Sequence, residues 1–154
     1  MPLFTTSRKP CARVRTLVKD LARLVPESET LSRGKQSVND VAESARRMGY
    51  PRVAVVTEMH GNPRTIRVLS VSESGWEWLP KQFAVKGVRL CREFEARVRR
   101  AEALKAEDGI GFSGALGVQS QDSGTVLKAT NEAITFFQGG AEVGPRLSLK
   151  RGPV

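Results

Sequence analysis

Near the start of the chain stands the stretch Phe4-Thr5-Thr6-Ser7-Arg8-Lys9-Pro10-Cys11-Ala12-Arg13-Val14-Arg15. It predicts a short apolar strand, a turn and then a helix, because Pro10 suits the first helical position, where its missing N–H has no partner to lose. Four cations crowd this helix start: Arg8, Lys9, Arg13 and Arg15. A helix N-terminus already carries about half a positive charge, so each cation there costs roughly 0.3–1 kcal/mol. A phosphate would reverse that sign, which points to an anionic partner.

The helix that begins in this stretch is expected over residues 10–25, because its apolar residues recur every three or four positions. Its outer face carries Arg15, Lys19 and Arg23. Like charges spaced four residues apart repel one another by a few tenths of a kcal/mol. The helix therefore presents a second sign of adaptation to an anion.

A second basic loop is expected after a short strand at residues 29–31. Its residues Arg33-Gly34-Lys35 lead into another helix. That helix begins with a capping box, in which Ser37 is the N-cap and Asp40 follows three residues later. Gly49 is a suitable residue to end it. If the two basic loops leave the same edge of a sheet, they form one patch whose backbone amides also face an anion.

The first 72 residues follow the order strand, helix, strand, helix, strand, strand, which is typical of an α/β unit. Its last two strands are expected at residues 52–58 and 65–71, linked by a turn at His60. For the rest of the chain the sequence predicts a strand with Trp76 and Trp78 on one face and further strands at 85–91, 115–119 and 144–150. It also predicts helices at 93–107 and 123–137.

The net charge of the 154-residue chain is +9 and its pI is about 10.3. Such a balance favours nucleic acid or another anionic surface as partner. No apolar run is long enough for a transmembrane helix, and charges from Arg8 onward interrupt any signal peptide, so a cytoplasmic protein without a membrane partner is expected. Cys11 and Cys91 have no metal-type spacing, and we expect both to be reduced and structural.

Other candidate sites are weak. The Gly109–Gly114 segment has G-x-G-x-x-G spacing, but it follows an expected helix rather than a strand, so a flexible loop is favoured over a nucleotide site. His60 alone makes neither a triad nor a zinc site. Trp76 and Trp78 favour packing, with stacking on RNA bases as the alternative. The sequence therefore predicts no catalytic residue, no cofactor, no metal and no small-molecule substrate.

A short sequence pattern in the middle of the chain recurs at its end; we call it the Gly-Pro echo. Gly61-Asn62-Pro63-Arg64 and Gly144-Pro145-Arg146 are both a turn and an arginine followed by an alternating strand. The echo is what a duplicated α/β half would leave.

Four motifs together resemble the Brix-domain family of ribosome-biogenesis proteins. They are Thr5-Thr6-Ser7-Arg8-Lys9-Pro10, Lys19-Asp20-Leu21, Arg33-Gly34-Lys35 and Gly144-Pro145-Arg146. The resemblance spans nearly the whole chain and is greatest to short archaeal members related to the small-subunit processome Brix proteins. One departure is Cys11, where many relatives have Ser. The least familiar part is residues 94–137.

The resemblance implies a single domain, 1–154, made of two similar α/β halves packed together, 1–72 and 73–154. Each half would resemble the anticodon-binding domain of class IIa aminoacyl-tRNA synthetases. It further implies a non-enzymatic factor that binds ribosomal RNA precursors and assists rRNA processing and small-subunit assembly, with other ribosome-assembly proteins as partners. The residues expected to hold phosphates are Arg8, Lys9, Arg13, Arg15, Lys19, Arg33, Lys35, Arg146 and Lys150.

Two alternatives remain. The first is a protein scaffold in a pre-ribosomal particle with little direct RNA contact, whose charge only aids solubility. The second is a nucleotide-dependent enzyme that uses the Gly109 loop.

Overall fold

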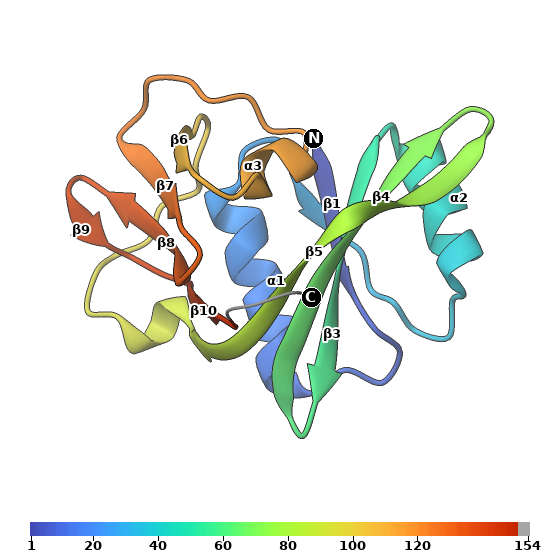
Figure 1. Cartoon of the computed structure of the whole chain (residues 1–154), viewed down its shortest axis with the longest axis horizontal. Coiled ribbons are helices and arrows are strands. Elements are labelled where there is room, and N and C mark those ends of the chain that lie inside the picture. The colour runs from blue at the N-terminus through green and yellow to red at the C-terminus, as the bar shows by residue number, and fades with distance from the viewer. Residues whose placement is uncertain (151–154) are drawn as a thin grey trace.

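The computed structural model describes residues 1–150. These residues form a ten-stranded mixed sheet, three α-helices and one short 3-10 helix (Figure 1). In chain order the elements are β1 (Pro2–Thr6), α1 (Ala12–Leu24), β2 (Glu29–Thr30), α2 (Val38–Met48), β3 (Arg52–Met59), β4 (Asn62–Ser72), β5 (Gly75–Arg89), η1 (Cys91–Glu93), β6 (Lys105–Asp108), α3 (Phe112–Ala115), β7 (Thr125–Ala129), β8 (Ala133–Gln138), β9 (Ala141–Glu142) and β10 (Arg146–Leu149). The expected α/β class is confirmed as a mixed α/β fold.

The two long helices form where the sequence predicts them. At the start of α2 the Ser37 side chain accepts from the backbone N–H of Asp40 at 3.1 Å, and the Asp40 carboxylate accepts from the backbone N–H of Ser37 at 3.1 Å. Gly49 ends this helix with a φ of 83°, a conformation that glycine adopts without strain. Both caps are local in sequence, so the ends of this helix could be predicted from the sequence.

The helices α1 and α2 cover opposite faces of the first strands, because successive strand residues point to opposite sides of a sheet. Phe4 and Val56 lie in one buried cluster with α1. Leu3 and Val55 lie in a second buried cluster with α2. None of the helices within residues 1–150 is both long and apolar enough to span a membrane.

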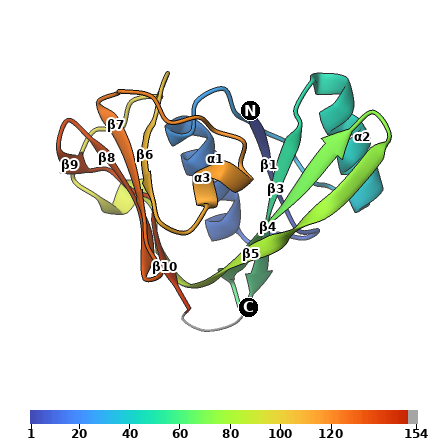
Figure 2. The same cartoon turned by 45° about the horizontal axis from the view of Figure 1, so that its top comes forward.

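The sheet runs in the order β2-β1-β3-β4-β5-β10-β8-β7-β6, and β9 pairs with β8 beside this series. Figure 2 shows it as two arms with α1 and α3 between them. In the first arm β1 pairs parallel with β3, and β3–β4 and β4–β5 are antiparallel. In the second arm β6 pairs parallel with β7, and β7–β8 and β8–β10 are antiparallel. The same order of pairing therefore occurs twice, and the two arms join through the antiparallel pair β5–β10.

Strand β5 belongs to both arms. Its residues 75–84 pair with β4 and its residues 85–89 pair with β10. The expected strand at 85–91 is thus the last part of one long strand that also carries Trp76 and Trp78. The Gly-Pro echo does not follow the repeated pairing, because the counterpart of β10 is β5, whereas Pro63 lies in β4.

Three expectations for the second half are wrong. The expected helix at 93–107 is an extended segment that ends in β6, and the expected strand at 115–119 is the end of α3 and a turn. The expected helix at 123–137 is the antiparallel pair β7–β8. The apolar residues of these segments are buried by packing on α1 and on neighbouring strands, so helical spacing did not require a helix.

Candidate nucleic-acid interface

The two N-terminal basic loops meet at one edge of the sheet. They are residues 7–11, after β1, and residues 31–37, after β2, and we call them together the N-terminal basic patch. The strands β1 and β2 are parallel neighbours, so both loops leave the sheet at the same end. Arg33 ties the second loop to the end of β1, where the first loop begins, by donating from Nη1 to the Thr6 carbonyl at 2.9 Å. The expectation that the loops form one patch is confirmed.

A cavity of about 280 Å³ lies between α1 and the 31–37 loop. Arg15 and Lys19 line it from α1, and Thr30 and Ser32 line it from the other side. None of its lining residues is acidic: they are Thr6, Pro10, Arg15, Val18, Lys19, Thr30, Leu31, Ser32, Arg33 and Gly34. Cations, hydroxyl donors and loop amides are the groups that bind phosphate oxygens.

Two of the expected phosphate contacts already have protein partners. Arg33 is only 7% exposed, and its Nε donates to the Gln36 carbonyl at 2.8 Å in addition to the bond with Thr6. Burial lowers the pKa of Arg33, and the neighbouring charge of Arg8 lowers it further. Arg13 donates from Nη2 to the Val88 carbonyl at 2.7 Å and to the Glu93 carboxylate at 2.8 Å. Both guanidinium groups therefore connect separate segments of the protein and have a structural role.

The other cations of the patch extend into solvent. Arg8, Lys9, Lys19 and Lys35 are exposed, and within residues 1–150 none of them forms an ion pair with a carboxylate. Arg15 is also exposed and donates to the Pro10 carbonyl at 2.9 Å, which leaves its charge uncompensated. These five side chains are the ones free to meet an anion.

The start of α1 has neither an acidic residue nor a side-chain cap of its own. Its first turn has no acidic residue, and the N-cap residue Cys11 makes no side-chain cap hydrogen bond. The Cys11 thiol instead contacts the Gly61 carbonyl at 3.2 Å. Lys9 adopts a φ of 56°, a left-handed conformation that few side-chain-bearing residues use outside tight turns and functional loops. The positive end of the helix dipole thus adds to the charge of the patch.

Arg146 and Lys150 lie elsewhere. The backbone N–H of Lys150 donates to the Ala84 carbonyl on β5, and β5 lies three strand spacings, or about 14 Å, from β1. Arg146 forms an ion pair with Glu142, with its Nε 2.8 Å from Glu142 Oε2. These two residues therefore do not join the N-terminal basic patch.

The chain is similar to archaeal proteins in sequence and in structure. It is 35% identical over 174 residues to the "Probable Brix domain-containing ribosomal biogenesis protein" of Aeropyrum pernix, over 95% of this chain and 93% of that protein. The protein of the same name from Pyrococcus horikoshii is 34% identical over 93 residues, which are 60% of this chain and 41% of that protein. No protein-family model matches the chain.

Solved structures agree with these sequences. The crystal structure of a probable ribosomal biogenesis protein from Aeropyrum pernix K1 superposes with a TM-score of 0.82 at 31% identity, over 99% of this chain and 97% of that one. The chain belongs to the Brix-domain family of ribosomal biogenesis proteins. The crystal structure of Mil, an archaeal Imp4-like protein, superposes with a TM-score of 0.68 at 26% identity, over 97% of each chain. The resemblance drawn from the four sequence motifs is confirmed.

In this Brix protein the Gly109–Gly114 segment stands in a different context from the one expected. It follows strand β6 and leads into α3, which is the order that the motif requires. The loop amides are nevertheless occupied, because the Asp108 carboxylate accepts from the N–H groups of Ile110, Gly111 and Ser113 at 3.0, 2.9 and 2.6 Å. Burial acts to raise the pKa of Asp108, but the hydrogen bond from the Ser113 hydroxyl and those from the loop N–H groups lower it overall. A fixed negative charge thus lies where a phosphate would bind.

The two tryptophans of the Brix protein pack against its second helix. Their rings lie edge to face with centroids 6.0 Å apart, and Trp76 Nε1 donates to the Asn39 side chain of α2 at 2.9 Å. The Arg67 guanidinium covers the Trp78 ring at 4.0 Å from its centroid. The expectation that both residues share a strand face is confirmed, and their contact with RNA stays untested.

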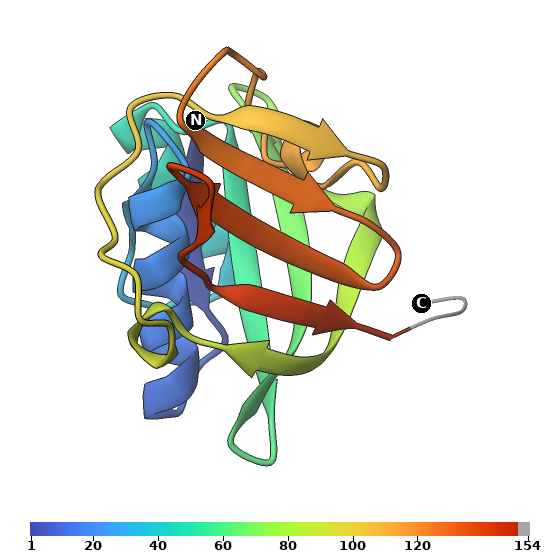
Figure 3. The same ribbon diagram turned by 90° about the vertical axis from the view of Figure 1, so that its left-hand side faces the viewer.

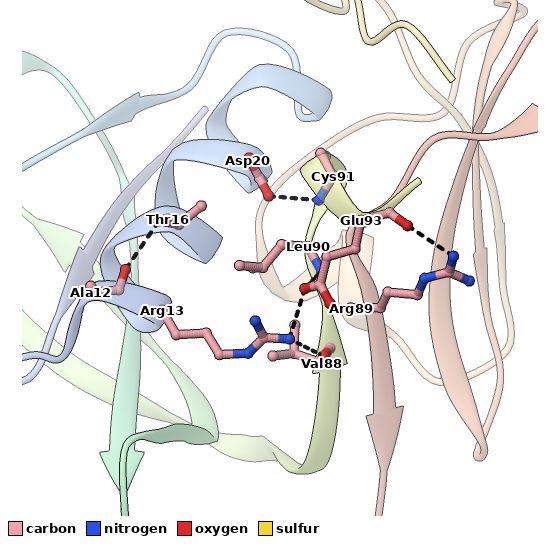
Figure 4. A network of polar contacts seen from close by, with 9 residues as sticks. All are labelled: Ala12, Arg13, Thr16, Asp20, Val88, Arg89, Leu90, Cys91 and Glu93. Carbon is pink, nitrogen blue, oxygen red and sulfur yellow. Dashed lines mark hydrogen bonds and ion pairs between the residues drawn. The ribbon is translucent and has the colours of Figure 1, made fainter. Parts of the chain in front are cut away.

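A network of polar contacts that the sequence did not predict ties α1 to the end of β5 (Figure 4). Asp20 is buried in α1 and accepts from the backbone N–H of Cys91 at 2.9 Å, while Arg89 donates to the Glu93 carbonyl at 2.8 Å. The available signal was the position of Asp20, three residues after Leu17 and within the apolar stripe of the helix. A carboxylate at such a position needs a donor from another segment.

Proposed function

We propose that this Brix protein is a non-enzymatic factor that binds ribosomal RNA precursors and assists rRNA processing and small-subunit assembly. The observation that carries the proposal is the cavity lined by Arg15 and Lys19 of α1, which has no acidic lining residue and lies beside the two loops that expose Arg8, Lys9 and Lys35. Phosphate contacts of this kind position a protein on RNA without reading its sequence. Specificity for a precursor would come from the shape of the folded RNA.

The residues divide into two roles under this proposal. Arg8, Lys9, Arg15, Lys19 and Lys35 contact phosphates, since no carboxylate within residues 1–150 forms an ion pair with them. The buried guanidinium of Arg33 ties the 31–37 loop to the end of β1, and Arg13 ties the start of α1 to β5. Arg146 and Lys150, which lie across the sheet, would meet a different part of the RNA.

The assignment to the small subunit rests on the similarity to Mil, which is described as Imp4-like. The proposal of two related halves, each like an anticodon-binding domain, is supported by the strand pairing that occurs twice in the sheet. The division at residue 72 stays a prediction, because β5 pairs with strands on both sides.

Filter binding of a precursor rRNA transcript at increasing salt tests the proposal. Arg8→Ala with Lys9→Ala removes two free cations, so the slope of log K against log salt should flatten by about 2. The free energy of unfolding should stay the same or rise slightly, because two cations leave a helix N-terminus. The control is Arg47→Ala with Lys105→Ala, which removes the same charge from exposed positions on α2 and β6.

A flat salt response of the wild-type protein would contradict direct RNA binding and favour the protein scaffold. Loss of folding in the double variant would show that Arg8 and Lys9 are structural. Equal weakening by the control pair would mean that net charge, rather than this patch, drives binding.

A further inference from the structure

A segment between the two arms runs along α1. Residues 90–101, which we call the strap, begin with η1 and otherwise form neither helix nor strand. Asp20 holds its start at Cys91. At its end Arg23 Nη2 donates to the Val98 carbonyl at 3.0 Å, and the Ala101 N–H donates to the Arg23 carbonyl at 2.8 Å. The strap therefore follows α1 toward its C-terminal end, as Figure 3 shows (yellow beside blue).

The strap is rich in exposed arginine. Its four are Arg92, Arg97, Arg99 and Arg100. Within residues 1–150 none of the four forms an ion pair, and the only strap carboxylate in an ion pair is Glu93, with Arg13 of α1. Arg100 donates to the Ser28 carbonyl at 3.1 Å, so its partner is neutral and its charge remains.

The exposed stripe of α1 meets the strap at Arg23. Arg15, Lys19 and Arg23 recur every four residues, and this spacing carries charge over about 12 Å of the helix. Arg23 also has a carbonyl partner rather than a carboxylate. Arg15 and Lys19 line the cavity of the N-terminal basic patch, so the stripe continues from that cavity toward the strap.

We propose that the α1 stripe and the strap form a cationic track that binds the phosphate backbone of double-helical RNA. The track offers no base-stacking platform: α1 has no aromatic residue, and the one aromatic residue of the strap is Phe94. The Phe94 ring is covered by Arg89 at 4.3 Å and flanked by Arg146 at 5.9 Å. Single-stranded RNA is held mainly by stacking on exposed aromatic rings, whereas duplex RNA is held through its backbone. This inference rests on the proposed function and extends it to a second surface.

The test uses the full chain and three labelled probes: RNA hairpins with stems of one and of two helical turns, and a U-rich single strand as long as the longer hairpin. Arg92→Gln, Arg97→Gln and Arg99→Gln are combined, because these three side chains are exposed and form no ion pair within residues 1–150. Arg23 and Arg100 are kept, because they fasten the strap. The control combines Arg47→Gln, Lys86→Gln and Lys105→Gln.

The wild type should prefer the two-turn hairpin over the other two probes. The strap variant should bind that hairpin on the order of tenfold more weakly, with a salt slope flattened by about 2–3. Its binding of the one-turn hairpin at the N-terminal basic patch should change little, and the control variant should resemble the wild type.

Unchanged two-turn binding by the strap variant, in a protein that binds RNA, would overturn the track and leave the proposed function standing. Equal wild-type affinity for the single strand would overturn the assignment to duplex RNA. Displacement of the hairpin by polyglutamate of equal charge would overturn the choice of RNA in favour of an acidic protein. A wild type without salt-dependent binding to any probe would instead contradict the proposed function itself.

Discussion

The two arms of the sheet share their strand pairing but differ in the helices that cover them. The first arm is packed between α1, of 13 residues, and α2, of 11 residues. The second arm contributes only α3, of four residues, and within residues 1–150 no helix of its own covers its outer face. Its strands nevertheless bury Leu127, Ile134, Phe136 and Leu147.

The cover for these residues comes from the first arm. Leu127, Ile134 and Phe136 belong to the same buried cluster as Leu17 and Leu21 of α1. The cluster around α2 contains residues of the first arm alone. A single helix therefore serves both arms, and we expect the second arm to depend on α1 for its stability while α2 stabilises the first arm only.

The largest effect is expected for Leu17→Ala. Leu17 is fully buried in the shared cluster, and truncating such a leucine costs about 2–5 kcal/mol. Because the cluster spans both arms, amide hydrogen exchange should lose protection in β3 and β4 and equally in β7 and β8. Denaturant unfolding with hydrogen exchange detected by mass spectrometry measures both quantities.

Leu69→Ala is the matched control, because Leu69 is equally buried but lies in the cluster around α2. Its loss of protection should be greatest in α2, β3 and β4. If instead Leu17→Ala spares β7 and β8, the arms are independent and the shared helix is not what stabilises the second arm.

A smaller loss of stability is expected for Gly144→Ala, which disturbs the contact between the strap and the second arm. Gly144 has a φ of 74°, and an added Cβ would lie 2.6 Å from Phe94 Cε2. We expect a loss of about 1–3 kcal/mol from backbone strain and overpacking together. Gly140→Ala has a similar φ of 83° with open space around it, so it reports the backbone part alone. Equal losses in the two variants would contradict the steric argument.

The difference between the arms also explains what the sequence could predict. In the first arm local signals act together: the capping box at Ser37, the stop at Gly49 and the apolar stripe of α1 all agree with the observed helices. The buried strand expected at 52–58 agrees with β3 for the same reason. Where each local choice supports the same element, tertiary contacts need not decide.

In the second arm tertiary contacts decide. The strap has apolar residues at helical spacing, but it is held extended by its bonds to Asp20 and Arg23, which no local pattern reveals. The expected helix at 123–137 contained a contrary signal, since Ile134 and Phe136 alternate with half-buried Thr135 and are β-branched or aromatic. The alternation was the better guide there.

The candidate site was predictable in its placement but not in its side-chain partners. Two loops that follow neighbouring parallel strands must share an edge, so the N-terminal basic patch could be expected from the order of elements. The bonds of Arg33 to Thr6 and of Arg13 to Val88 join residues 27 and 75 positions apart. Such partners are set by packing, and they decide which cations stay free.

The smallest effect is expected for Asp20→Asn, at the joint between α1 and the strap. Burial raises the pKa of Asp20, which the Cys91 N–H and the charges of Arg23 and Arg92 only partly offset. The folded state therefore favours the protonated acid, and the wild type loses stability as pH rises from the unfolded-state pKa of about 3.9 through the folded pKa. Burial and the neighbouring carboxylate raise the pKa of the Cys91 thiol to about 12, so the thiol stays neutral over this range.

The amide side chain introduced by Asp20→Asn keeps an acceptor for the Cys91 N–H but cannot ionise. At low pH the free energy of unfolding should therefore differ from that of the wild type by less than about 1 kcal/mol. Toward neutral pH the variant should become more stable relative to the wild type. Urea unfolding of both proteins from about pH 4 to about pH 7 measures the difference between their free energies of unfolding. Taking this difference cancels the contribution of the other carboxylates, which both proteins share. A wild type that gains on Asp20→Asn as pH rises would mean that the charged hydrogen bond outweighs burial, and that the joint between the arms is held by the carboxylate itself.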